Sequence, residues 1–168
     1  MKRLFFILMA SILISCGTGV NVKSPSNNTA LKLKPFKLIV YNANYSMAYA
    51  VQYVLTNKSL EIIFKGQLEK ERDSVLFKTS LQANETLEKL SNINIGSLQE
   101  YYSNPCIRDG SQITVKLKKG FKSKMVHLSN YYQPDIGLAI ELINGLVPKE
   151  YQIWYDKEEL IKDMKNCK

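Results

Sequence analysis

The first sixteen residues constrain this chain more than any other feature, because they combine a basic start, an apolar stretch and a cysteine. Lys2 and Arg3 precede residues 4–14, an eleven-residue stretch in which the most polar side chain is Ser11. A helix of that length spans roughly 16 Å, about half of the hydrocarbon core of a bilayer. The stretch is therefore too short to cross a membrane, and it predicts a secretory signal peptide and an exported chain.

The end of this stretch resembles the lipobox of bacterial lipoproteins. Leu13 stands three places before Cys16, and the small residue Ser15 directly precedes it. The resemblance implies cleavage before Cys16, diacylglycerol on its sulfur and a fatty amide such as palmitate on its nitrogen. Each buried CH2 group contributes about 0.8 kcal/mol, so two or three acyl chains anchor a protein without a transmembrane helix. The alternatives are an ordinary signal peptide followed by an unmodified cysteine, or a buried N-terminal helix.

The residues after Cys16 predict where the protein resides and where its domain begins. Gly17 is similar to the pattern that sends lipoproteins to the outer membrane rather than the inner one, so we expect a periplasm-facing, lipid-anchored envelope protein. Residues up to 34 are rich in Gly, Asn, Ser and Thr and contain Pro25, a composition typical of a flexible tether. The predicted divisions are a signal peptide over 1–15, lipidated Cys16 with its tether over 16–34, and one domain over 35–168.

Two cysteines remain once Cys16 is assigned to the lipid. Cys106 and Cys167 form an even pair in an exported chain, where disulfides persist, so a Cys106–Cys167 disulfide is predicted. The alternative is a free thiol nucleophile at Cys106 assisted by His127, the only histidine in the chain. No catalytic motif surrounds Cys106, and the disulfide also accounts for Cys167.

Hydrophobic periodicity predicts a single α+β domain. Apolar and aromatic runs divided by short turns at Asn57-Lys58 and Lys119-Gly120 indicate antiparallel hairpins. Helical spacing behind Asn84, Pro134 and Asp156 predicts helices with recognisable first turns. The expected order is about ββββααββαβα, a mainly antiparallel sheet with helices packed on one side. Strands are expected at 36–45, 48–56, 59–67, 74–79, 112–118, 121–128 and, as a short strand or extended link, 151–155; a short second helix is expected at 97–102.

Positive charge is concentrated in two segments. The chain has 23 Lys and Arg against 15 Asp and Glu, and residues 16–60 and 111–134 each carry five lysines and no acid. An exported chain does not meet nucleic acid, so anionic lipid or acidic glycan is the better ligand for such charge. The alternative is that lysines keep an edge hairpin soluble. The candidate anionic-ligand patch on the second hairpin comprises Lys116, Lys118, Lys119, Lys122 and Lys124.

Aromatic and hydroxyl residues supply the remaining candidate sites. Two adjacent tyrosine pairs, Tyr101-Tyr102 and Tyr131-Tyr132, could line a sugar- or peptide-binding surface, although aromatics on sheets more often pack in a core. Ser74, within Asp73-Ser74-Val75, resembles the short acceptor for O-glycosylation used by some bacteria. His127 is expected to be a hydrogen-bonded packing residue.

Three classes of function remain open. A non-enzymatic accessory module that binds an envelope protein partner is favoured; the alternative is a binding or inhibitor lipoprotein for an anionic lipid, a glycan or an envelope enzyme. A hydrolytic enzyme is the least favoured class, because the chain contains no G-x-S-x-G, H-E-x-x-H, phosphate-loop or dinucleotide motif. We therefore expect no catalytic residue, no metal and no cofactor.

Overall fold

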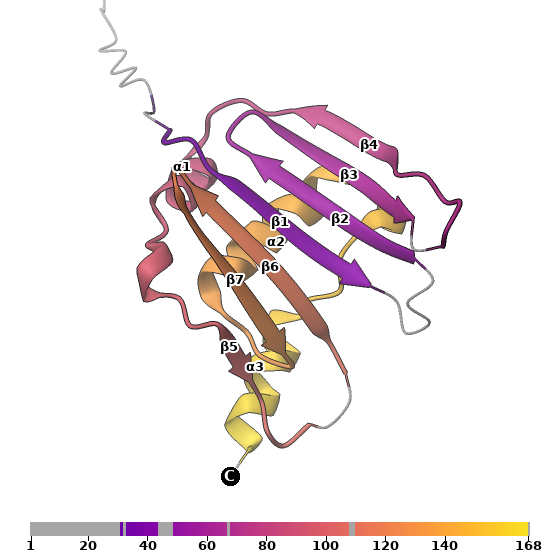
Figure 1. Cartoon of the computed structure of the whole chain (residues 1–168). Coiled ribbons are helices and arrows are strands. Elements are labelled where there is room, and N and C mark those ends of the chain that lie inside the picture. The colour runs from indigo at the N-terminus through magenta and orange to yellow at the C-terminus, as the bar shows by residue number, and fades with distance from the viewer. Residues whose placement is uncertain (1–30, 32, 44–48, 67, 108–109, 168) are drawn as a thin grey trace, which may run out of the picture.

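The computed structural model describes residues 31, 33–43, 49–66, 68–107 and 110–167 (Figure 1). Their central feature is a seven-stranded sheet in the order β4-β3-β2-β1-β6-β7-β5, antiparallel except where β5 joins β7. With its three α-helices this confirms the predicted α+β fold. The strands are β1 (Lys37–Ala43), β2 (Tyr49–Thr56), β3 (Ser59–Gly66), β4 (Ser74–Ser80), β5 (Tyr101–Ser103), β6 (Gln112–Lys119) and β7 (Lys122–Ser129).

The hydrophobic core lies between one face of the sheet and the helices. Alternation along β1 turns Leu38 and Val40 inward, and alternation along β6 does the same for Val115 and Leu117; all four are at most 2% exposed. Figure 1 shows the helices behind one face of the sheet, while the other face carries no helix among the described residues.

The helices begin where local sequence signals place them. In α1 (Glu85–Asn92) the Asn84 side chain accepts a hydrogen bond from the Leu87 amide, 2.8 Å. In α3 (Lys157–Asn166) Asp156 does the same for Glu159, 2.8 Å. Pro134 opens α2 (Pro134–Leu146), the helix with the most buried residues. These cap interactions satisfy amides that a helix start leaves without intrahelical partners, which is why the helix starts can be read from sequence.

Three local predictions are corrected. The expected helix over 97–102 is instead a single 3-10 turn, Ile95–Ser97, followed by β5, which pairs in parallel with the end of β7. The second hairpin turns at Gly120-Phe121 rather than Lys119-Gly120, since Lys119 pairs directly with Lys122. Residues 151–155 form no strand; a 3-10 turn, Lys149–Tyr151, leads into an irregular link.

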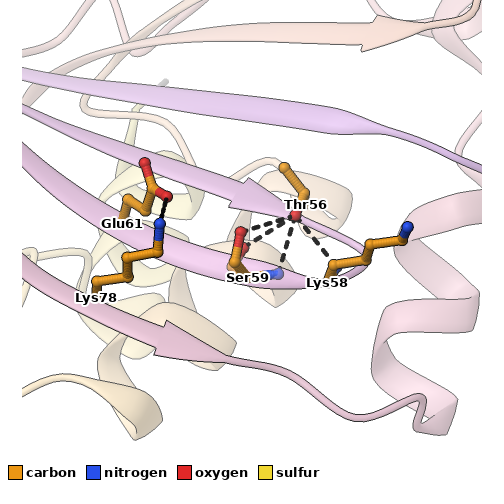
Figure 2. A network of polar contacts seen from close by, with 5 residues as sticks. All are labelled: Thr56, Lys58, Ser59, Glu61 and Lys78. Carbon is orange, nitrogen blue, oxygen red and sulfur yellow. Dashed lines mark hydrogen bonds and ion pairs between the residues drawn. The ribbon is translucent and has the colours of Figure 1, made fainter.

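The turn between β2 and β3 is held by one hydroxyl group. Figure 2 shows the Thr56 hydroxyl at the centre of this turn, where it accepts hydrogen bonds from the amides of Lys58, 3.1 Å, and Ser59, 2.9 Å. On the neighbouring strands Glu61 and Lys78 form an ion pair of 2.7 Å. The turn at Asn57-Lys58 is therefore confirmed, and its backbone is fixed by a short polar side chain.

The start of α2 is tied to the segment before α3 by tyrosines. The Tyr155 hydroxyl accepts a hydrogen bond from the Gln133 amide and donates one to the Tyr131 carbonyl, 2.9 Å each. Burial, the main cause, raises the pKa of Tyr155 well above its usual value. Gly137 lies under the Tyr132 ring, where an added Cβ would stand 2.6 Å from it, so this position of α2 requires glycine.

We expect Tyr155→Phe to lower the free energy of unfolding by about 2 kcal/mol at neutral pH, because two backbone groups lose their partner. The raised pKa keeps Tyr155 protonated in the folded state, whereas the unfolded chain releases this proton above about pH 10. The free energy of unfolding of wild type should therefore fall as the pH rises above that value. The gap between the unfolding free energies of wild type and Tyr155→Phe should then narrow.

Denaturant unfolding between neutral pH and pH 11 measures this difference. Tyr41→Phe is the matched control, because the Tyr41 hydroxyl bonds to no other described residue. Equal stability of the two tyrosine variants would contradict the role given to the Tyr155 hydroxyl.

Candidate functional site

The helix-free side of the sheet, here called the open face, carries a continuous row of side chains from one edge to the other. Strand register places one residue of each strand beside the next, because residues directly opposite in a ladder share a face. The row mixes aromatic, amide, hydroxyl and aliphatic groups and ends at both edges in exposed apolar side chains. Its members are Tyr101, His127, Thr114, Tyr41, Gln52, Ile63 and Val75.

A groove of about 430 Å³ lies at the β5–β7 end of this row. Tyr101 is 70% exposed, and its ring stacks on His127 with the centroids 5.0 Å apart. Met125, two residues before His127, is also exposed. Glu100 and Lys124 add opposite charges to the lining. The groove is lined by Glu100, Tyr101, Ser123, Lys124, Met125 and His127.

Among the described residues, the His127 side chain makes one hydrogen bond and one ring contact. Its Nδ1 lies 3.0 Å from the Thr114 hydroxyl, and Tyr101 covers one ring face. Among the described residues, no hydrogen bond joins His127 to a carboxylate. No group of three His, Cys, Asp or Glu in the described ranges could hold a metal ion. The predicted hydrogen bond of His127 is therefore present, and it lies on the open face.

On the side away from β6, part of β7 pairs with no described strand. The amide of His127 donates to the Glu100 carbonyl, 2.8 Å, and the amide of Asn104 donates to the Ser129 carbonyl, 2.9 Å, so this edge is paired only along the last residues of β7. Alternate residues of an antiparallel strand direct their backbone groups to the same edge. Ser123 and Met125 therefore direct N–H and C=O groups to the side occupied by β5 further along, where no described strand pairs with them.

The segment before β5 makes specific contacts that lie outside the β7 ladder. The Lys124 ammonium donates to the Leu98 carbonyl, and the Gln99 amide donates to the Tyr102 hydroxyl, 2.9 Å. Both backbone groups are therefore engaged outside the β7 ladder. The result is an open length of strand edge directly beside the groove, which we call the open β7 edge, at Ser123 and Met125.

The five lysines of the second hairpin do not share one surface. Lys116 and Lys118 lie on the open face, whereas the ammonium groups of Lys119 and Lys124 bond to backbone carbonyls near the end of α1 and before β5. Desolvation, and secondarily the charge of Lys34, lower the pKa of Lys119. Lys122 is exposed beside the turn. The predicted five-lysine patch is therefore divided, and two of its members hold the hairpin in place.

The four tyrosines are likewise separated. Only Tyr101 lines the groove. Tyr102 packs on Tyr131 with ring centroids 5.2 Å apart, and Tyr132 is buried against Tyr155, 5.6 Å. Three of the four predicted surface tyrosines thus contribute to packing, and the fourth belongs to the candidate site.

The predicted disulfide is present. Cys106 and Cys167 are bonded with their Cα atoms 5.5 Å apart, across a sequence separation of 61. The bond joins the turn after β5 to the end of α3. Ser74 is exposed at the start of β4, so O-glycosylation there stays a prediction. Cys16 lies outside the described residues.

Sequence patterns did not reveal two parts of this region. Glu100 and Met125 line the groove together only because β5 begins beside His127 of β7. A three-residue parallel strand has no recognisable sequence signal. The open β7 edge follows from that same short pairing. The exposure of Phe121, in contrast, was predictable from the sequence. Gly120-Phe121 between two lysines fits a two-residue hairpin turn, which places the Phe121 side chain at the tip.

No protein-family description, curated protein or solved structure matches the chain. In the part of the chain that the structure describes, no helix is both long enough and apolar enough to span a bilayer.

Proposed function

We propose that this chain is an exported, non-enzymatic lipoprotein, anchored at the cell envelope through Cys16, whose open β7 edge binds an extended segment of an envelope protein partner. The observation that carries the binding role is the free backbone edge at Ser123 and Met125 next to the groove. Strand addition at a sheet edge provides affinity through backbone hydrogen bonds and specificity through pockets for alternate side chains.

The groove supplies such a pocket. Its stacked Tyr101 and His127 rings offer apolar surface, and Met125 adds an unbranched side chain that adapts to different partners. The exposed carboxylate of Glu100 can orient polar groups of an incoming segment. The lipid anchor supports this role because it confines both molecules to the same surface, which raises their effective concentration.

Met125→Glu tests the site, because it places a charge in the groove without altering the core. With full-length lipidated protein from membranes solubilised in mild detergent, wild type should retain a stoichiometric partner, and Met125→Glu should bind it at least about tenfold more weakly. Leu76→Glu on β4 is the matched control, since Leu76 and Met125 are both 39% exposed.

Equal retention by all three proteins would contradict the assignment to the open β7 edge. Isolation of wild type as a monomer with no partner would contradict the interaction role itself.

A second function is favoured by the exposed Tyr101 ring. A flat aromatic face beside Glu100 can stack on a sugar ring and hydrogen-bond to its hydroxyls. If the groove binds glycan, envelope glycan fragments should shift the NMR signals of His127, and Tyr101→Ala should abolish those shifts. An unchanged His127 spectrum at saturating glycan would dismiss this function.

A further inference from the structure

One end of the domain gathers lysines from three separate segments around an exposed aromatic residue. We call it the hairpin end, and Figure 1 shows there the start of β1, the β2–β3 turn and the β6–β7 turn. Register supports the arrangement: Lys37 of β1 stands opposite Lys118 of β6 and opposite Thr56 of β2. The hairpin end comprises Lys34, Lys37, Lys58, Lys118, Phe121 and Lys122.

Phe121 is fully exposed at the tip of the β6–β7 hairpin. Only two residues join the strands there, and Gly120 adopts the left-handed backbone conformation, φ 56°, that tight hairpin turns require. The aromatic ring is therefore carried beyond the ends of two paired strands. A fully exposed Phe is costly in water, and an apolar group of this kind fits a surface into which it can insert.

The lysines of the hairpin end are placed against one another. Lys37 stands directly opposite Lys118, and Lys122 stands opposite Lys119, a lysine outside this set whose ammonium bonds to carbonyls near the end of α1. Like charges directly opposite in a sheet are destabilising. The charge of Lys34 also reaches Lys119, whose pKa it helps to lower after the larger effect of desolvation. An anionic surface would relieve this repulsion.

Protection of a sheet edge does not account for two of these charges, those of Lys37 and Lys118. β1 lies between β2 and β6, and β6 lies between β1 and β7, so Lys37 and Lys118 stand on interior strands. The solubility role that edge lysines usually have therefore does not apply to them.

Little negative charge offsets the lysines at this end. Residues 31–60 and 111–134 contain no Asp or Glu. Glu61 on β3 is paired with Lys78, and Figure 2 shows the Lys58 side chain directed away from that pair. The adjoining helix α1 carries Glu85 and Glu88 in its first turn. The strands and turns of the hairpin end thus form a surface of one sign.

The chain also enters the described domain at this end. Leu31 and residues 33–36 lead into β1 beside the β6–β7 turn, and Cys16 precedes them in sequence. We propose that the hairpin end binds the anionic phospholipid surface of the membrane, with Phe121 inserted among the headgroups and the lysines on their phosphates. This inference goes beyond the proposed partner site and shares with it only the setting at a membrane.

Residues 16–168 carrying Cys16→Ser test the proposal without acyl chains. This protein should sediment with vesicles of phosphatidylglycerol and phosphatidylcholine in equal parts, and not with phosphatidylcholine alone. Replacing Lys37, Lys118 and Lys122 by Gln should weaken binding about 100-fold, since each lysine near an anionic surface contributes about a factor of five. The same variant should unfold no more easily than wild type, because like-charge pairs are removed.

A matched triple variant keeps the change of net charge constant. Gln at Lys149, Lys162 and Lys165, all exposed outside the hairpin end, should alter binding by less than about threefold. An equal loss in both triple variants would overturn the proposal, because general attraction would then explain the binding. Equal sedimentation with neutral vesicles would overturn it as well.

A fluorescent reporter tests the insertion of the tip. Trp154 is the only tryptophan, so Trp154→Phe provides a background in which Phe121→Trp is the single reporter. Its emission should shift to the blue with anionic vesicles and be quenched by brominated lipid; unchanged emission would refute insertion. This protein carries no lipid and needs no partner. A negative result would therefore not contradict the Cys16 anchor or the binding role of the open β7 edge. Likewise, loss of either of those proposals would not contradict membrane binding by the hairpin end.

Discussion

Replacing both Cys106 and Cys167 by serine is expected to lower the free energy of unfolding by about 4 kcal/mol. The disulfide closes a loop across a sequence separation of 61, and loop-closure entropy in the unfolded chain gives a value of that size. Packing of α3 in the folded state can offset little of this loss of stability, because the helix has a single buried side chain, Leu160. We therefore expect α3 to open locally before the sheet unfolds.

Denaturant unfolding gives the total change, and amide hydrogen exchange locates it. In the double serine variant the amides of α3 should exchange much faster, while those of β1 and β6, at the centre of the sheet, should change only as global stability falls. Reduced wild-type protein is the control and should match the serine variant. A loss below about 1 kcal/mol would show that α3 is held mainly by noncovalent contacts, such as Lys157 over the Tyr132 ring, 5.5 Å from its centroid.

Removing the proposed lipid by Cys16→Ala is expected to move the protein almost entirely from the membrane to the soluble fraction. Two acyl chains anchor stably, whereas hairpin-end contacts alone bind reversibly and weaken with salt. Wild-type protein should show an intact mass above that of its polypeptide by the acyl groups, and Cys16→Ala should lack this increment. Fractionation and intact mass of the same material give both results.

The variant needs a control, because a signal peptide that is no longer cleaved at Cys16 would itself hold the chain in the membrane. Exporting residues 17–168 behind a signal peptide of the ordinary secretory type removes that apolar stretch and the cysteine together. This protein should be soluble after a high-salt wash. An unmodified mass for wild type, or a membrane location for the control, would contradict the anchor.

The second hairpin shows where reasoning from sequence succeeds and where it ends. Alternation in 112–118 correctly placed Lys116 and Lys118 on one face. It could not show that Lys119 and Lys124 reach the carbonyls of Ser91 and Leu98, because those contacts join segments far apart in the chain. The basic character of the hairpin was therefore predictable, and the division of its lysines was not.

The different roles of two adjacent tyrosines also depend on contacts between segments far apart in the chain. Nothing local distinguishes Tyr101 from Tyr102, yet the first stacks on His127 in the groove and the second packs on Tyr131. Their roles depend on the parallel pairing of β5 with β7, which replaced the helix expected at 97–102. A three-residue strand is formed by its neighbours, so its own sequence does not predict it.

Sequence patterns alone predicted the type and order of most elements, the starts of α1, α2 and α3, and the pairing of Cys106 with Cys167. Hydrophobic periodicity and capping residues are local signals, and the disulfide follows from the number of cysteines that remain. None of these predictions requires knowing which segments of the chain meet. The open β7 edge, the groove beside Tyr101 and the gathering of lysines at the hairpin end emerged only from the folded sheet. Each depends on strand order and register, which are set by packing the whole core.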